Sequence, residues 1–122
     1  MKNLILIGAG SWGLEVWSWL KDAQGFGERF RFKGFLDTKL RHFGEGHFCQ
    51  ASILGSTLDY SIQPNDVFVC TIGDPSAKKQ VVEDMLKKGA EFTNLIHSSV
   101  IEFQSITYGS GVIVSPNCVI SN

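Results

Sequence analysis

Three glycines near the amino terminus have the spacing of a phosphate-binding turn. Gly8, Gly10 and Gly13 form a G-x-G-x-x-G pattern, directly after the apolar run Leu4–Ile7 and at the start of a helical pattern. In such a fingerprint the first glycine allows a tight turn, the second lets a phosphate approach the backbone, and the third permits close packing of helix and strand. The amides at the start of the helix then face an anion. The pattern predicts a nucleotide site, and a glycine-rich turn that binds nothing is the alternative.

An acidic residue and an aromatic residue add to this prediction. Asp37 follows the predicted strand Phe30–Leu36, close to the spacing of about 20 residues after Gly13 at which a carboxylate receives a ribose hydroxyl. Trp12 lies inside the glycine loop and is a candidate neighbour of a ligand. Strand, glycines, helix and acid together indicate a nucleotide more specifically than the glycines alone.

A second strand-to-helix junction belongs to the same edge of the predicted sheet. The segment Ile72–Pro75 forms the junction at which the strand-like run Val67–Ile72 ends and the amphipathic helix Ser76–Gly89 begins. Ligands of open parallel sheets bind at the carboxyl ends of the strands, where this junction falls. Asp74 is therefore predicted either to cap the helix through Ser76 or to contact a ligand.

The cysteines and histidines form no recognisable catalytic or metal-binding set. Three cysteines lie far apart and form no C-x-x-C pair, namely Cys49, Cys70 and Cys118. We therefore expect neither a zinc site nor a disulfide framework, and a reducing compartment is favoured. His42 and His47 are interpreted as loop residues, because a metal site needs three or four converging ligands. His97 is interpreted as structural rather than catalytic, so we predict no metal site and no catalytic residue.

Composition and charge limit the classes of protein that fit. The chain has 122 residues, a formal net charge of −1 at pH 7, and 43% hydrophobic residues. This length excludes a two-domain dehydrogenase, and the charge offers no electrostatic argument for nucleic acid or an anionic membrane. The run Leu4–Ile7 is too short for a signal peptide, and no segment approaches the ~20 apolar residues of a membrane span. We expect a cytoplasmic protein that binds neither nucleic acid nor membrane.

The elements that must position these residues alternate between strands and helices. Strands are predicted over Leu4–Ile7, Phe30–Leu36, Ala51–Leu54, Val67–Ile72 and Phe92–Ile96. Helices are predicted over Leu14–Asp22 and Ser76–Gly89, a loop over Lys39–Gln50 and a helical turn over Ser56–Tyr60. Such alternation predicts an α/β fold with a Rossmann-like open parallel sheet and flanking helices.

The carboxyl-terminal segment has a period of six residues. Two apolar ladders recur with this step, one at Val100, Ile106, Val112 and Cys118, the other at Tyr108, Val114 and Ile120. A hexapeptide period is typical of a β-helix, in which each repeat forms one flat side of a triangular coil. A single β-hairpin over Ile106–Ile120, turning at Ser115–Asn117, is the alternative.

Five motifs, in order along the chain, resemble the bacterial sugar O- and N-acetyltransferases of surface-glycan and sialic-acid biosynthesis. They are Ile7–Gly13, Gly34–Asp37, Ile53–Ser56, Thr71–Asp74 and Leu95–Ser99. Members of this family join a Rossmann-like amino-terminal domain to a left-handed β-helix of hexapeptide repeats. The resemblance implies a nucleotide-sugar-binding domain at residues 1–97 and the first coil of an incomplete β-helix at residues 98–122.

The resemblance also implies an activity. Members move an acetyl group from acetyl-CoA, their co-substrate, to the amine or hydroxyl of a UDP-amino-sugar or related sugar. A complete β-helix binds acetyl-CoA between the subunits of a homotrimer, and one of its histidines acts as general base. That histidine lies beyond Asn122, and the family commonly has a histidine where this chain has Trp12. We therefore expect no cofactor and no acetyl transfer in this chain alone, and weak or no binding of a UDP-sugar.

The candidate nucleotide-sugar-binding residues come from the glycine loop and from the ends of two later strands. They are Gly8, Gly10, Ser11, Trp12, Gly13, Asp37, Thr38, Ile72 and Gly73. A non-catalytic NAD(H)-binding Rossmann module is the alternative function, and it leaves the six-residue period unexplained. A protein–protein scaffold with a vestigial pocket is a third hypothesis.

Overall fold

The computed structural model describes residues 1–37, 53–102 and 108–120. Thr38, Ile106 and the predicted loop Lys39–Gln50 lie outside these ranges. The main strands are β1 (Lys2–Ile7), β2 (Phe30–Leu36), β3 (Ile53–Gly55) and β4 (Asp66–Cys70). The helices are α1 (Ser11–Trp19), the short 3₁₀ helix η1 (Leu20–Asp22) and α2 (Pro75–Lys87). Neither α-helix in the described part of the chain is long and apolar enough to cross a membrane.

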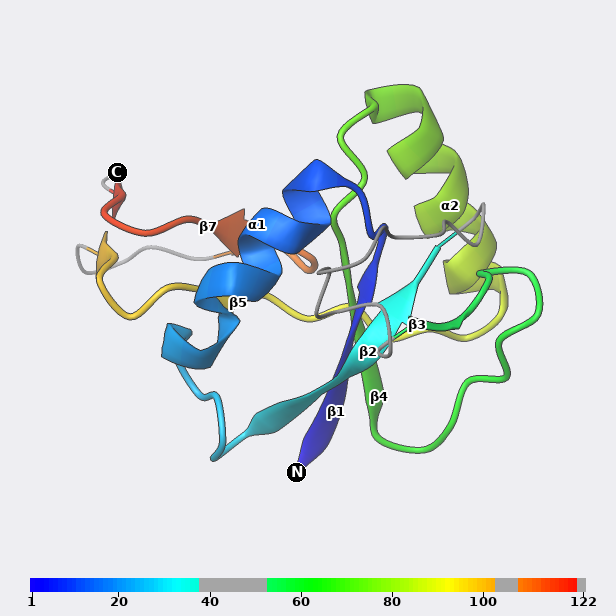
Figure 1. The fold of residues 1–122 in the computed structure, drawn as a ribbon, viewed down its shortest axis with the longest axis horizontal. Helices are drawn as coiled ribbons and strands as arrows, with labels where there is room; N and C mark the ends of the chain where they lie inside the picture. The colour runs from blue at the N-terminus through cyan, green and yellow to red at the C-terminus, as the bar shows by residue number, and fades with distance from the viewer. Residues whose placement is uncertain (38–52, 103–107, 121–122) are drawn as a thin grey trace, which may run out of the picture.

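The four main strands form one parallel sheet in the order β3-β2-β1-β4. The chain runs outward from β1 through β2 to β3 and then crosses back to place β4 on the other side of β1. The predicted Rossmann-like open sheet with flanking helices is therefore confirmed, and Figure 1 shows α1 and α2 on either side of it. In such sheets the reversal of strand order opens a crevice at the carboxyl ends of the strands.

Side chains of β1 alternate between two cores, one on each face of the sheet. Leu4 and Leu6 pack with Val16 of α1, whereas Ile5 and Ile7 pack with Met85 of α2. All four β1 side chains are fully buried. A strand covered on both faces is expected to be apolar without interruption, and that is why this run predicts a central parallel strand correctly.

Helix α1 begins earlier than the predicted Leu14. Its first residue is Ser11 and its amino-terminal cap is Gly10, so the third glycine of the loop, Gly13, lies inside the helix. The prediction placed all three glycines before the helix, and glycine is indeed a poor residue for a helix interior. Close packing against β1 overrides this preference.

The predicted strand Phe92–Ile96 is not a fifth strand of the main sheet. Phe92 forms only an isolated parallel bridge with Phe68 of β4. The chain then leaves the sheet, and β5 (Leu95–Ile96) pairs instead with β7 (Ile113–Val114). An apolar run indicates a buried strand but carries no information about its partner, which explains the error.

The carboxyl-terminal strands pair in parallel at a constant offset. Leu95 pairs with Ile113 in the β5–β7 pair, and Ile101 pairs with Val119 between β6 (Ile101–Glu102) and β8 (Val119–Ile120). Both pairs are separated by 18 residues, which is three hexapeptides and the length of one triangular coil. The hairpin alternative requires antiparallel pairing within this segment, and the parallel partners contradict it.

Candidate functional site

A pocket of about 430 Å³ lies at the carboxyl ends of β1 and β4, between the first turns of α1 and α2. This is the place where the strand order reverses, and it is the expected ligand crevice of such a sheet. Seven of the predicted residues line it, namely Gly8, Gly10, Ser11, Trp12, Asp37, Ile72 and Gly73. Thr71, Asp74, Ala77 and Val81 are the other described residues that line it. Thr38 lies outside the described residues, and Gly13 does not line the pocket.

Gly8 turns the chain away from β1 beneath the pocket. Its φ is +111°, a backbone conformation that side chains other than hydrogen rarely permit. A Cβ at this position would lie 3.0 Å from the Ile72 side chain and 3.1 Å from the Thr71 carbonyl oxygen. The Gly8 amide donates to the carbonyl oxygen of Leu36 at 2.7 Å, which ties the turn to β2. Position 8 therefore requires glycine for two reasons, its positive φ and the lack of room for a Cβ atom.

Thr71 directly follows β4, the strand that pairs with β1, and its side chain fixes the Gly8 turn. Thr71 was not among the site residues predicted from the sequence. Its hydroxyl is 2.7 Å from the carbonyl oxygen of Gly8 and 3.1 Å from that of Ile7, and its side chain is buried. Its amide also donates to the Ile7 carbonyl oxygen at 2.8 Å. The hydroxyl therefore fixes the end of β1 to the end of β4. In the sequence Thr71 stood out only as the first residue of the motif Thr71–Asp74, near the end of the predicted strand Val67–Ile72.

The start of α1 presents backbone N–H donors at the pocket. Gly10 caps the helix without a side-chain hydrogen bond, and the first helical bond runs from the Leu14 amide to the Gly10 carbonyl oxygen at 3.0 Å. The amides before Leu14 have no intrahelical acceptor, as at any helix start, and they add to the positive end of the helix dipole. Such a terminus can hold an anion.

Helix α2 begins differently, because Asp74 caps it. The Asp74 carboxylate accepts a hydrogen bond from the Ala77 amide at 2.9 Å, and Pro75 occupies the first turn. The predicted cap is thus confirmed, with Ala77 rather than Ser76 as the donor. Asp74 also lines the pocket, so its two predicted roles are compatible in space.

Asp37 and Trp12 border the pocket from different elements. Asp37 is 2% exposed, and its amide donates to the Gly55 carbonyl oxygen of β3 at 3.1 Å. Trp12 is half-buried in the first turn of α1. The ammonium group of Lys78 on α2 lies 5.3 Å from the centroid of the Trp12 ring. The side chains of Trp12 on α1 and Lys78 on α2 are therefore in contact across the opening of the pocket.

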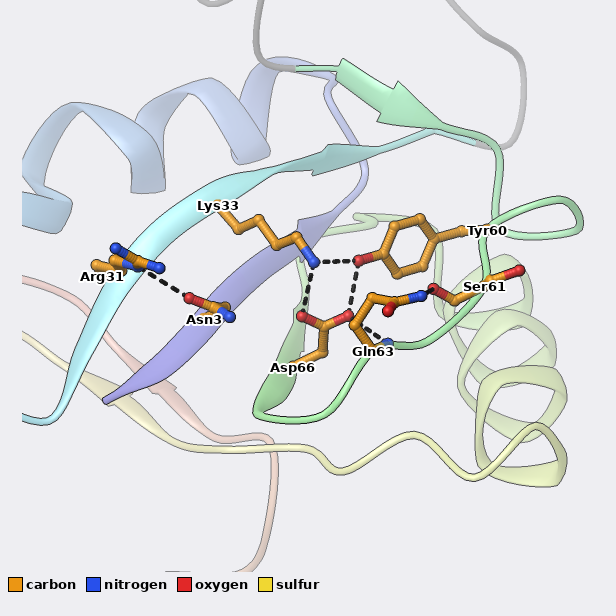
Figure 2. Close-up of polar contacts among 7 residues, drawn as sticks. All are labelled: Asn3, Arg31, Lys33, Tyr60, Ser61, Gln63 and Asp66. Atoms are coloured by element: carbon orange, nitrogen blue, oxygen red, sulfur yellow. Dashed lines mark hydrogen bonds and ion pairs between the residues drawn. The ribbon is translucent and has the colours of Figure 1, made fainter.

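A second polar cluster lies at the opposite end of the sheet, where β4 begins. The Asp66 carboxylate accepts hydrogen bonds from Lys33 at 2.9 Å, from the Tyr60 hydroxyl at 2.6 Å and from the Gln63 amide at 2.8 Å. Lys33 also contacts the Tyr60 hydroxyl at 2.7 Å, which closes the triangle shown in Figure 2. Every oxygen of the buried carboxylate thus has a partner, and the cluster joins β2, β4 and the segment between them.

These contacts shift the pKa of all three groups. Burial favours the neutral acid of Asp66, but hydrogen bonds from Tyr60 and Gln63 and the charge of Lys33 hold its pKa below the ordinary value. Burial likewise opposes the charge of Lys33, but its contacts with Tyr60 and Asp66 raise its pKa. Burial and the bond to Asp66 raise the pKa of Tyr60. The cluster contributes to stability far from the pocket, and nothing in its sequence spacing predicted it.

His97 lies in the first turn of the carboxyl-terminal coil. Its Nδ1 accepts the Ser99 amide at 2.9 Å, and its ring meets that of Trp19 edge-on with centroids 5.6 Å apart. The Ser99 hydroxyl oxygen accepts the amide of Asn117, 18 residues further along, at 2.7 Å. His97 therefore contacts α1 and its own loop, while Ser99 joins this loop to the segment around Asn117.

Comparisons with known proteins identify the relatives of this arrangement. The family model described as the PglD N-terminal domain matches residues 3–85. No curated protein sequence matches the chain. The fold is similar to that of PerB from Caulobacter crescentus in complex with CoA and GDP-perosamine, with a TM-score of 0.78 and 19% identity over 99% of this chain and 55% of that one.

A second solved structure has the same fold. It is the acetyltransferase domain of PglB from Neisseria gonorrhoeae in complex with acetyl coenzyme A, with a TM-score of 0.73 and 24% identity over 97% of this chain and 55% of that one. The chain therefore spans a little over half the length of these structures. In both comparisons the match extends beyond the parallel sheet into the carboxyl-terminal coil.

Proposed function

The chain belongs to the PglD N-terminal domain family, and on this premise we propose that it supplies the nucleotide-sugar-binding domain of a bacterial sugar acetyltransferase. The observation that carries the proposal is the pocket at the reversal of strand order, where the glycine turn, the start of α1 and Asp37 come together. The similar fold of PerB, a protein whose structure contains GDP-perosamine, supports a nucleotide-linked amino-sugar as the ligand.

The lining residues suggest how such a ligand would be held. The amides at the start of α1 suit a diphosphate, because they present several donors at the positive end of a helix dipole. Asp37 suits a ribose hydroxyl, which can donate to its carboxylate. Gly8 and Gly10 leave room for the phosphates to approach the backbone. We propose a UDP-linked or GDP-linked amino-sugar as the substrate class.

The carboxyl-terminal coil supports the acetyltransferase part of the proposal. Its parallel strands, 18 residues apart, have the spacing of a hexapeptide β-helix, which we propose begins within residues 98–122. We further propose that acetyl-CoA is the co-substrate of the complete enzyme, bound by that β-helix between the subunits of a homotrimer. PglB, which shares this fold, was solved with acetyl coenzyme A. The catalytic base then lies outside these 122 residues.

Calorimetric titration of the 122-residue chain tests the ligand class. The sequence predicted weak or no binding of a UDP-sugar by this chain alone. Because seven of the predicted residues line one pocket, we expect weak but measurable heat of binding with UDP or GDP and their amino-sugar derivatives, and none with NADH. Asp37→Asn should weaken this binding because an amide accepts a ribose hydroxyl less strongly than a carboxylate. Glu83→Gln, an exposed change on α2, is the matched control.

Two results would contradict the proposal. Binding of NADH with no response to UDP or GDP indicates the alternative NAD(H) module. Transfer of acetyl from acetyl-CoA to an amino-sugar by this chain alone overturns the assignment of the catalytic base to another segment. The second measurement needs only the release of free CoA thiol with and without the sugar nucleotide.

A further inference from the structure

The diphosphate that we propose as part of the ligand is negatively charged, and the pocket that would bind it contains acidic side chains. Among the described residues that line it, the charged side chains are Asp37 and Asp74, and both are carboxylates. A diphosphate would meet like charge from these two groups, and the helix start offers only about half an elementary charge in compensation. A cationic side chain near the opening would offset this repulsion and add to the attraction of the helix start.

Lys78 is placed to supply that charge. It lies on α2 between Ala77 and Val81, and both of these line the pocket. Its side chain is partly buried, and its ammonium group lies 5.3 Å from the Trp12 ring centroid on the facing helix. Among the described residues it forms no ion pair, whereas Lys33 is paired with Asp66.

The charge of Lys78 also affects a group at the carboxyl end of β4, the Cys70 thiol. Burial raises the pKa of the Cys70 thiol at the carboxyl end of β4, while the Ile72 amide and the charge of Lys78 act in the opposite direction. Lys78 thus acts electrostatically on the sheet edge that forms the floor of the pocket. Neither Lys78 nor its neighbour Lys79 lines the pocket directly, but the two differ in their surroundings. Lys79 is exposed, and among the described residues it contacts no aromatic ring and forms no ion pair.

We propose that Lys78 is the side chain that binds the diphosphate of the nucleotide-sugar, and that Trp12 holds its ammonium group at the opening of the pocket. This inference rests on the proposed function and names the part of the ligand that each side chain recognises. A cation–π contact at a solvent-accessible site is weak, so phosphate oxygens can recruit the ammonium group from the ring. Trp12 then remains as an apolar wall against which the sugar or base can pack.

Titration of three chains with four probes tests the inference. Wild type, Lys78→Met and Lys79→Met are each titrated with UDP, GDP, uridine and guanosine. We expect Lys78→Met to weaken binding of UDP or GDP about tenfold or more, because a charge-assisted hydrogen bond to phosphate is lost. Binding of the nucleosides should not change. Lys79→Met should behave as wild type, and Lys78→Arg should recover much of the affinity for the diphosphates.

The salt dependence provides an independent readout. Added salt should weaken UDP binding by wild type more steeply than by Lys78→Met, because screening acts on the charge that the variant lacks. Methionine keeps most of the aliphatic length of lysine, and thermal unfolding of each variant verifies that the fold is intact.

The outcomes separate the two proposals. If wild type binds neither diphosphates nor nucleosides, the proposed function fails, and this inference fails with it. If wild type binds UDP or GDP and the Lys78→Met and Lys79→Met variants bind them with equal affinity, only the role of Lys78 is overturned. An equal loss for nucleosides and diphosphates also overturns it, because that pattern indicates damage to the pocket rather than loss of a phosphate contact.

Discussion

A Cβ atom on Gly13 would lie 2.0 Å from the carbonyl oxygen of Gly8. No real Cβ tolerates such a distance from a backbone atom, so the start of α1 and the end of β1 are in the closest possible backbone contact. The same Cβ would lie 3.0 Å from the Thr71 hydroxyl, which itself holds the Gly8 carbonyl oxygen. The third glycine of the motif therefore acts on the pocket indirectly, by setting how closely the helix approaches the turn.

Substituting Gly13→Ala should destabilise the protein although alanine is the better helix former. The added methyl group forces α1 away from β1, and overpacking of this kind costs about 1–3 kcal/mol. Urea unfolding measures the change in free energy. Gly109→Ala is the control, because a Cβ there meets nothing within 4 Å. Equal stability of the two variants would show that α1 can shift without cost.

The Asp66 cluster should make stability depend on acidity. The folded-state pKa of Asp66 lies below its ordinary value of 3.8, so its contribution is present above that value and is lost as the pH falls through the folded-state pKa. At pH 7 the free energy of unfolding of Asp66→Asn should therefore be about 1–3 kcal/mol lower than that of wild type. Between pH 7 and pH 3 the free energy of unfolding of the variant should fall less than that of wild type. Urea unfolding at both pH values measures this.

The control for this prediction is Glu83→Gln, which neutralises an exposed carboxylate on α2. It should keep the stability and the acid dependence of wild type. An Asp66→Asn variant whose stability falls as steeply as that of wild type between pH 7 and pH 3 would contradict the pairing described for Lys33, Tyr60 and Asp66.

Two adjacent serines in the coil should respond differently to alanine. The Ser99 hydroxyl oxygen accepts a hydrogen bond from the amide of Asn117, 18 residues further along the chain. Ser98 donates its backbone amide to Asp22, and among the described residues its hydroxyl group has no hydrogen-bond partner. Ser99→Ala should cost about 1 kcal/mol and speed hydrogen exchange at Asn117, and Ser98→Ala should do neither. Equal exchange rates in the two variants would mean that this contact does not stabilise the stacked layers.

Removing the cap of α2 should weaken that helix without closing the pocket. Asp74→Ala should cost about 1 kcal/mol, while Asp74→Asn should retain most of the stability because its amide oxygen can accept the Ala77 amide. Ser76→Ala is the control, because it removes a neighbouring hydroxyl group while leaving the backbone amides of the first turn in place. Thermal unfolding distinguishes the variants, and a larger loss for Ser76→Ala than for Asp74→Ala would refute the observed cap.

Local patterns in the sequence were sufficient for much of the fold and for most of the pocket. The glycine motif, the apolar run of β1 and the acid after β2 each describe one turn or one strand, and seven of the nine predicted site residues meet in one pocket. The six-residue period predicted a coil, and the offset of 18 residues is three of its repeats. The prediction of the parallel sheet is confirmed because the spacing of side chains within an element reports which of its faces is buried, whereas the ligand site and the β-helix stay predictions.

Contacts between distant segments were decided only by the tertiary structure. Phe92–Ile96 was assigned to the main sheet because its composition suits any buried strand, yet its end pairs with β7. The contact of Trp12 with Lys78 and the cluster around Asp66 likewise join residues from separate elements. The register of the strands and the crossing of the chain over the sheet determine which side chains meet, and no pattern within a single element contains that information.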